Sequence, residues 1–197
     1  MLLRHPTRWE DPSLPRIEIN PTTGAYEYLE SISEIKVNDY VITTNGTILT
    51  EEIADYLSKN RKLRFAISMD GHKFSNQLRV FKVSRKNTYD KVMENIELLR
   101  KYNVEPSIHI TSHLYNIAYL ESSINHLYNK GIRDIDVGTI ESTMKIDEEY
   151  CNRFISELDI VSQKIIDGTY SGLQIGLFNY LKPHSDIRSY IKECGFK

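Results

Sequence analysis

The sequence predicts an α/β fold in which parallel strands alternate with helices. The segment Asp39–Gly71 contains an apolar strand that ends at Asn45-Gly46, then an amphipathic helix, then a second apolar strand. A crossover of this length joins parallel strands. Helices and strands continue to alternate as far as Gly168, which indicates a barrel, a partial barrel or a doubly wound sheet. No Gly-x-Gly-x-x-Gly or Walker-type loop follows any strand, which argues against the common nucleotide-binding versions of such a fold.

The elements are placed by residue spacing and by turn residues. Strands are expected at 40–44 and 64–69, joined by a helix that Thr50 caps and that buries Ile53, Tyr56 and Leu57. The later expectations are a loop over 72–87, a helix over 89–102 capped by Thr88, a strand over 105–113, a helix over 117–130 ended by Gly131, a strand over 133–140, a helix over 147–167 ended by Gly168, and a short helix over 187–194.

Length and element spacing predict one domain with three parts. Residues 1–36 read as an irregular N-terminal segment, with a candidate short strand and a candidate short helix. Residues 37–168 form the predicted β/α core, and residues 169–197 form a C-terminal segment. The interpretation is a single core with irregular sequence on either side of it.

Charge and cysteine content exclude several classes of protein. Lys and Arg total 25 against 27 Asp and Glu, for a net charge of −2, so no overall field favours nucleic acid or an anionic membrane. Apolar runs have strand length and the N-terminus is too short and polar for a signal peptide, which predicts a cytoplasmic location. Cys151 and Cys194 lie far apart in the sequence and make neither a disulfide framework nor a zinc site.

Polar side chains gather where the predicted strands end. Parallel strands place their carboxyl ends at one edge, where ligands bind. The residues expected there are Thr44, Asn45, Ser68, Asp70, Ser112, His113, Thr139 and Glu141. Asp70, His113 and Glu141 would suit a hydrolase or lyase, and His109 with His113 would suit a metal pair that has further ligands. For each of these residues the simpler interpretation is structural, as a turn residue, a strand-end hydroxyl or a core residue.

Several stretches resemble the radical S-adenosylmethionine enzymes. Tyr40–Thr50 is similar to the third strand and turn of that family, and Ile67–Lys73 resembles its fourth strand, usually written I-S-L-D-G-P. Leu78–Phe81, Lys86–Ile96 and Tyr128–Ile132 resemble the segments that follow. The likeness points to the branch with a SPASM-type C-terminal extension, which contains peptide maturases and anaerobic sulfatase-maturing enzymes.

The resemblance covers roughly residues 38–145 and implies a partial (β/α) barrel that binds S-adenosylmethionine at its strand ends. It implies a hydrogen bond from Ser68 to the ribose or carboxylate of the cofactor, and an ion pair between Arg79 and that carboxylate. It adds Thr44, Asn45 and Asp70 as cofactor-binding positions. No catalytic residue is assigned.

Two family motifs are missing from the sequence. The family holds a [4Fe–4S] cluster on a Cys-x-x-x-Cys-x-x-Cys loop, which Cys151 and Cys194 cannot supply. A Gly-Gly-Glu-Pro motif that holds the amine of the cofactor is replaced by Asn20–Gly24. The expected fold therefore lacks the first βα unit, and the chain's own cysteines support no cluster and no other metal.

Two hypotheses of different classes follow. In the first, the chain is a fragment or a cluster-less member of the radical S-adenosylmethionine family, related to peptide- and protein-modifying maturases and without autonomous catalysis. In the second, it is a non-catalytic module that binds a peptide or a partner chain. The resemblance implies a peptide or protein substrate, and an uncovered sheet edge would permit self-association.

Overall fold

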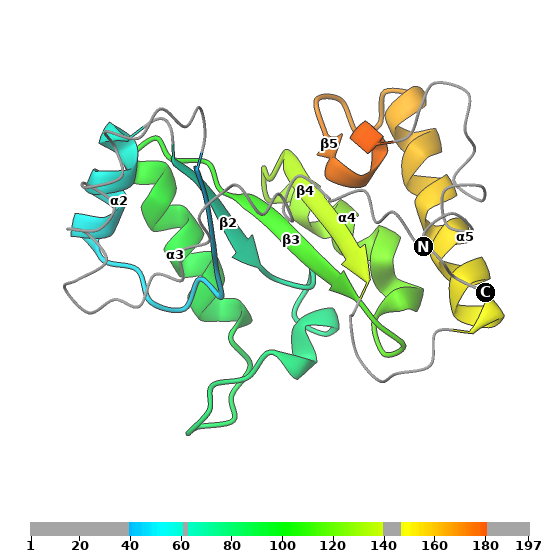
Figure 1. Cartoon of the computed structure of the whole chain (residues 1–197), viewed down its shortest axis with the longest axis horizontal. Helices are drawn as coiled ribbons and strands as arrows, with labels where there is room; N and C mark the ends of the chain where they lie inside the picture. The colour runs from blue at the N-terminus through cyan, green and yellow to red at the C-terminus, as the bar shows by residue number, and fades with distance from the viewer. Residues whose placement is uncertain (1–39, 61–62, 140–146, 181–197) are drawn as a thin grey trace, which may run out of the picture. The chain divides into compact units, whose positions relative to one another are not determined.

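The computed structural model describes residues 40–60, 63–139 and 147–180 (Figure 1). These residues belong to two compact units. The first unit comprises the described residues up to Ile67 together with Lys91–Pro106, and the second comprises Ser68–Asp90 and the described residues from Ser107 onward. No helix within the described ranges is long and apolar enough to cross a membrane.

The first unit is a strand–helix–strand crossover with one further helix. Strand β1 (Tyr40–Thr44) pairs in parallel with β2 (Leu63–Ser68), and helix α2 (Glu51–Lys59) connects them. The Thr50 hydroxyl caps α2 by accepting the amide proton of Ile53. Parallel pairing and the Thr50 cap confirm two expectations from the sequence.

The core of the first unit lies between these elements and α3 (Tyr89–Lys101), which belongs to this unit from Lys91 onward. The side chain of Asn95 on α3 is buried, and its Nδ2 donates to the carbonyl of Gly46 at 2.7 Å. This bond holds the turn after β1 against α3. The buried apolar side chains of this unit include Ile42, Leu57, Phe65, Ile67, Ile96 and Leu99.

The second unit contains three parallel strands in sequential order. Strand β3 (Ser107–Ser112) pairs with β4 (Asp134–Thr139), and β4 pairs with the short β5 (Gln174–Ile175). Figure 1 shows α4 (Leu120–Asn129) behind β3 and β4, with α5 (Glu148–Ile166) beyond it. The remaining short helices are η1 (Ser75–Leu78), η2 (Ile117–Tyr119) and η3 (Gly176–Tyr180).

The start of α5 and the ends of α4 and α5 lie within one residue of the prediction, whereas Ile117–Tyr119, expected to begin the helix of α4, form the 3₁₀ helix η2. Asp147 caps α5 by accepting the amide proton of Tyr150 at 2.9 Å. Gly131 and Gly168 follow α4 and α5 with φ of +85° and +84°, the left-handed conformation that ends helices. The parallel α/β class predicted from the sequence is therefore confirmed.

Two expectations for the segment between β2 and α3 are wrong. Thr88 does not cap α3 as expected: Asn87 Oδ1 accepts the amide proton of Tyr89 at 2.8 Å, while the Thr88 hydroxyl donates to the carbonyl of Arg79 at 3.1 Å. The region expected to be a plain loop contains η1 and an antiparallel bridge between Val80 and Asn87. The Thr88 hydroxyl is buried, so it forms hydrogen bonds with the neighbouring segment that contains Arg79 and not with the first turn of α3.

Some expectations lie outside the described residues. These concern the candidate strand and helix within residues 1–36, the short helix over 187–194, Glu141, and Cys194. Among the described strands, β1 is paired only with β2.

Replacing Gly71 by alanine tests how tightly the turn after β2 is packed. Gly71 has φ of +106°, and a Cβ there would lie 2.1 Å from the Cβ of Ser123 on α4. Gly168→Ala is the matched control, because Gly168 has φ of +84° with nothing within 4 Å of a Cβ. Both variants carry a backbone penalty of about 1–2 kcal/mol.

Gly71→Ala should cost about 1–3 kcal/mol more than the control, because the added methyl has no space. Urea denaturation followed by circular dichroism measures both free energies of unfolding. Equal losses in the two variants would show that α4 does not pack against this turn.

Candidate functional site

The last residue of β2 and the turn after it begin the candidate site in the second unit. The amide of Met69 donates to the carbonyl of His109 on β3 at 3.0 Å, which fixes the chain as it leaves the strand. Ser68, one residue earlier, is half-buried, and its hydroxyl has no partner among the described residues. Ser68 therefore presents a hydroxyl that can bond a ligand.

Asp70 and Arg79 form a two-pronged ion pair. Arg79 Nε donates to Asp70 Oδ2 at 2.8 Å and Nη2 donates to Oδ1 at 2.7 Å. The Asp70 side chain is 3% exposed and the Arg79 side chain 26%. Parallel N–H···O bonds of this kind are the strongest arrangement of an arginine on a carboxylate.

Thr111 on β3 joins this pair to the strand. Its amide donates to Asp70 Oδ1 at 3.1 Å, and its hydroxyl accepts from Arg79 Nη2 at 3.2 Å. Both carboxylate oxygens of Asp70 are therefore engaged within the protein. The Nη1 group of Arg79 has no partner among the described residues, so it is the part of the guanidinium that can reach a ligand.

Asn76 on η1 supports the same turn from the other side. Its side-chain oxygen accepts the amide proton of Asp70 at 3.0 Å, and its nitrogen donates to Asn87 Oδ1 and Thr88 Oγ1, each at 3.2 Å. Asn76 is fully buried, so these bonds replace hydration that it has lost. The position of Asp70 is thus set from both η1 and β3.

His113 follows β3 and holds one unpaired polar atom. The ring is 3% exposed, and its Nδ1 accepts the amide proton of Tyr115 at 3.2 Å. The proton must therefore sit on Nε2, which has no hydrogen-bond partner among the described residues. Burial lowers the pKa of His113, opposed by Asp70 and assisted by Arg79. A neutral imidazole with an unused N–H donor results.

Ser112, the residue before His113, is already bonded. Its hydroxyl accepts the phenol proton of Tyr150 on α5 at 3.0 Å, and both side chains are buried. Burial raises the pKa of Tyr150 to about 12, so the phenol stays protonated and remains a donor. Ser112 belongs to the packing between β3 and α5.

The structure does not assemble the metal pair considered for His109 and His113. His109 Nδ1 lies 3.3 Å from Oδ2 of Asp136, its register partner on β4, while His113 lies beyond the end of β3. No group of three or more His, Cys, Asp or Glu that could hold a metal occurs among the described residues.

The hydrolase or lyase hypothesis also loses Asp70 as a catalytic group, because the Asp70 carboxylate is engaged by Arg79 and Thr111.

Thr44 and Asn45 lie in the first unit, at the end of β1. Thr44 Oγ1 accepts the amide proton of Gly46 at 3.2 Å, and Asn45 Oδ1 accepts both the amide and hydroxyl protons of Thr47, at 3.0 and 2.8 Å. These local bonds close the turn that the sequence predicted. Their predicted contact with a cofactor stays a prediction.

The cysteines do not fit an iron–sulfur cluster. The sequence contains two, fewer than the three thiolates that the family's cluster requires. Cys151 lies within α5, where burial and the nearby Asp147 and Glu148 raise the pKa of its thiol. A raised pKa disfavours the thiolate that binds iron.

Comparisons with known proteins agree with the fold. A sequence model of the Radical SAM superfamily matches residues 17–150. Cysteine-type anaerobic sulfatase-maturating enzymes of Clostridium novyi and Clostridium perfringens are 36% identical over 69 residues and 33% over 96 residues. The first alignment covers 35% of this chain and 18% of the relative, and the second 45% and 26%. The chain thus spans about a quarter or less of these relatives.

Solved structures show the same fold. The structure of anSMEcpe with bound AdoMet superposes with a TM-score of 0.65 and 20% identity, covering 78% of this chain and 46% of that one. SuiB of Streptococcus suis superposes with a TM-score of 0.57 and 14% identity, covering 77% and 35%. The family match spans more than half of the sequence, and the parallel strands and strand-end motifs agree with it. The chain belongs to the radical SAM superfamily.

Proposed function

We propose that this chain contains an S-adenosylmethionine-binding site of a protein that modifies peptides or proteins, related to the anaerobic sulfatase-maturating enzymes. The observation that carries the proposal is the Asp70–Arg79 pair, held at the end of β3 by Thr111 and two residues after the open hydroxyl of Ser68. A fixed cation and a free hydroxyl suit a ligand that has both a carboxylate and a ribose.

Each donor group is assigned to a different part of the cofactor. Arg79 Nη1 donates to the methionine carboxylate, and Asp70 acts as a positioning residue because it holds the guanidinium without touching the ligand. Ser68 bonds the ribose, and His113 Nε2 offers a further N–H. Thr44 and Asn45 are assigned to the cofactor by resemblance alone.

S-adenosylmethionine would supply the reactive sulfonium, while the residues described here bind and orient it. A [4Fe–4S] cluster does not fit the cysteines of this sequence, so we propose that these 197 residues have no catalysis of their own. As a fragment or a cluster-less member of the family, the chain would bind the cofactor without catalysing a reaction of it.

A second candidate function is a non-catalytic module that binds a peptide or partner chain. The two cysteines favour it, because binding needs no cluster. The solved anSMEcpe structures include one with both AdoMet and a peptide, the Cp18Cys peptide. Self-association through the edge of β1 belongs to this alternative. Binding of S-adenosylmethionine distinguishes the two candidates, since only the first requires it.

Removing the hydroxyl of Ser68 should weaken binding of S-adenosylmethionine. One neutral hydrogen bond contributes about 0.5–1.5 kcal/mol, so Ser68→Ala should raise the dissociation constant by roughly 3- to 10-fold. Ser162→Ala is the control, because the Ser162 hydroxyl on α5 donates to the carbonyl of Asp159 and is exposed. Isothermal titration calorimetry gives both constants. Binding unchanged in Ser68→Ala would remove Ser68 from the site.

Replacing Arg79 by lysine should discriminate between two ligands. Lysine keeps the charge but has a single nitrogen, which cannot hold Asp70 at two points and also reach the ligand, so contact with the methionine carboxylate should weaken by roughly tenfold. Methylthioadenosine has the ribose and adenine without the carboxylate, and its affinity should not change. Asp70→Asn should act in the same direction, because the guanidinium loses its ionic partner. Equal losses for both ligands would mean that Arg79 only supports the fold.

The purified chain should not assemble an iron–sulfur cluster. After anaerobic reconstitution with iron and sulfide, we expect no visible absorption from a cluster and no 5′-deoxyadenosine from S-adenosylmethionine under reducing conditions. Iron analysis and chromatography of the products measure both. Recovery of cluster iron together with cofactor cleavage would refute the claim that catalysis is absent, while leaving the binding site in place.

A further inference from the structure

A short hairpin extends from the second unit between Val80 and Asn87. These two residues form an antiparallel bridge. The hairpin is the green loop at the bottom of Figure 1. Phe81 N donates to the carbonyl of Lys86 at 2.9 Å, and Arg85 N donates to the carbonyl of Phe81 at 2.9 Å. The five residues 82–86, which we name the hairpin tip, are all exposed.

The base of the hairpin is fixed to the rest of the second unit. Asn87 Nδ2 donates to the carbonyl of Lys73 at 2.9 Å, and its Oδ1 accepts from Asn76. The amide of Thr88 donates to the carbonyl of Arg79 at 2.9 Å. Arg79, the ion-pair partner of Asp70, therefore also belongs to the base of the hairpin. A loop held in this way loses little conformational entropy when it binds a partner.

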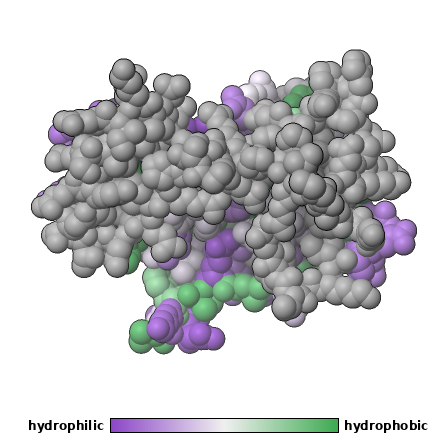
Figure 2. All heavy atoms as spheres, in the orientation of Figure 1, coloured by the Kyte–Doolittle hydropathy of each residue, from purple (hydrophilic) through white to green (hydrophobic). Residues whose placement is uncertain are grey.

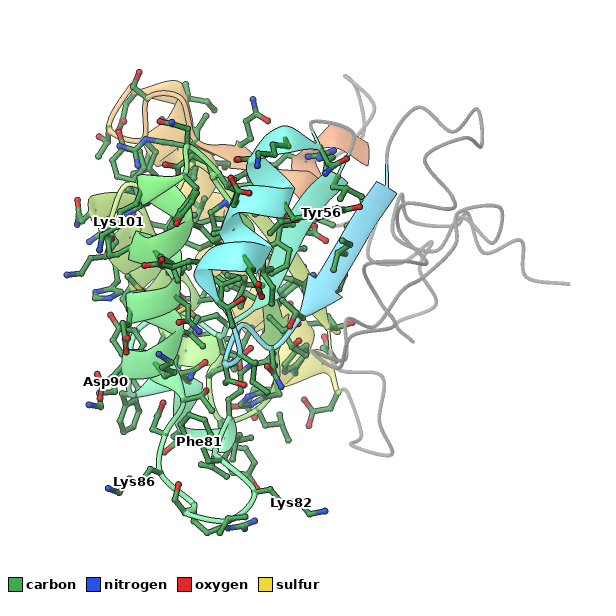
Figure 3. All side chains as sticks on the ribbon, turned by 90° about the vertical axis from the view of Figure 1, so that its left-hand side faces the viewer. Tyr56, Phe81, Lys82, Lys86, Asp90 and Lys101 are labelled. Carbon is green, nitrogen blue, oxygen red and sulfur yellow. The ribbon has the colours of Figure 1, made fainter. Side chains whose placement is uncertain are left out.

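The hairpin tip carries cations that no described residue neutralises. Lys73 at the base pairs with Asp90 at 2.5 Å, and Arg79 pairs with Asp70. Lys82, Arg85 and Lys86 have no ion pair among the described residues. Figure 3 shows Lys82 and Lys86 extending away from the ribbon on opposite sides of the tip.

Apolar side chains are exposed beside these cations. Val83 at the tip is 94% exposed, and Phe74 and Leu78 on the η1 segment are each 55% exposed. Figure 2 shows hydrophobic and hydrophilic residues side by side on this projection. A tip that combines three unpaired cations with an almost fully exposed valine presents two kinds of contact to a partner.

We propose that the hairpin tip is a docking site for an acidic polypeptide segment that contains an apolar residue. Carboxylates of the segment would meet Lys82, Arg85 and Lys86, and its apolar side chain would cover Val83. Charge complementarity identifies this occupant, because the tip concentrates three cations in a chain whose net charge is −2. The inference extends beyond cofactor binding and does not depend on it.

Other anionic partners fit the tip less well. Single-stranded nucleic acid is bound by exposed rings on which bases stack, and within the hairpin itself, residues 80–87, the one aromatic ring is that of Phe81, which is half-buried. A membrane surface would be contacted by a single valine at the tip, whereas stable anchoring needs more apolar area or a larger basic cluster. A polypeptide matches the small size of the projection.

Fluorescence anisotropy with the whole chain and no S-adenosylmethionine tests the proposal. The probe is a short labelled peptide in which Glu and Leu alternate, and its partner probe carries Gln in place of Glu. We expect binding to the Glu peptide that weakens with salt, and markedly weaker binding to the Gln peptide. Lys82→Ser/Lys86→Ser should weaken binding to the Glu peptide by roughly 3- to 10-fold.

Three further variants separate the effect of charge from effects on structure. Lys101→Ser/Lys130→Ser removes two exposed cations elsewhere and should leave the affinity unchanged. Arg85→Gly removes a tip cation at a residue with φ of +56°, a conformation that glycine adopts readily, so the turn is kept while binding weakens. Val83→Ser should weaken binding without altering its salt dependence.

Three results would overturn the proposal. The first is no binding to the Glu peptide, and the second is an equal loss in the two double variants. The third is tighter, tip-dependent binding to oligonucleotides, to phosphatidylserine vesicles, or to a second copy of the chain detected by light scattering. Because no cofactor is present, none of these results bears on S-adenosylmethionine binding.

Discussion

The ion pair between Asp70 and Arg79 is the contact on which the second unit's site depends. It joins the turn after β2 to the segment that begins the hairpin, and Thr111 connects both to β3. Removing one partner of a buried pair typically costs about 3–5 kcal/mol, because the remaining charge is left without compensation. Partial exposure of Arg79 places this pair toward or below the lower end of that range.

The same pair also determines what Arg79 can do chemically. The Nε and Nη2 edge, which would normally clamp a ligand carboxylate, is occupied by Asp70. Only Nη1 remains without a partner among the described residues. The guanidinium is therefore held rigidly, but it can offer a ligand only this one nitrogen. Asp70 thus orients Arg79 precisely, but Arg79 can no longer bind a ligand carboxylate through two nitrogens.

Much of the fold could be predicted from the sequence, because hydrophobic spacing and turn residues act locally. The pattern around Thr50 and the apolar residues of α2 indicated the crossover, and Gly131 and Gly168 marked the ends of two helices. Thr88 was misassigned because its position favours a cap in isolation, whereas burial makes its hydroxyl serve Arg79 and Asn76. Sequence spacing contains no information on that competition.

The candidate site was predictable in its residues but less so in their partners. Ser68, Asp70 and Arg79 were singled out by motif, yet nothing in the sequence indicated that Asp70 would be fully engaged by Arg79 and the amide of Thr111. Asn76 was missed altogether, because its role depends on a short helix within a segment that reads as loop. Backbone donors and buried amides leave no signal in a sequence.

The buried ring of His113 links the stability of the second unit to acidity. Its pKa lies below the usual 6.5 in the folded protein because burial disfavours the imidazolium, so the unfolded chain binds a proton more readily. The sign follows from linkage: the stabilisation is complete above pH 6.5 and is lost progressively as the pH falls below that value. Acidification therefore acts on the residue that follows β3, at the same end of the strand as Thr111, which makes the candidate site a point of acid sensitivity in this fold.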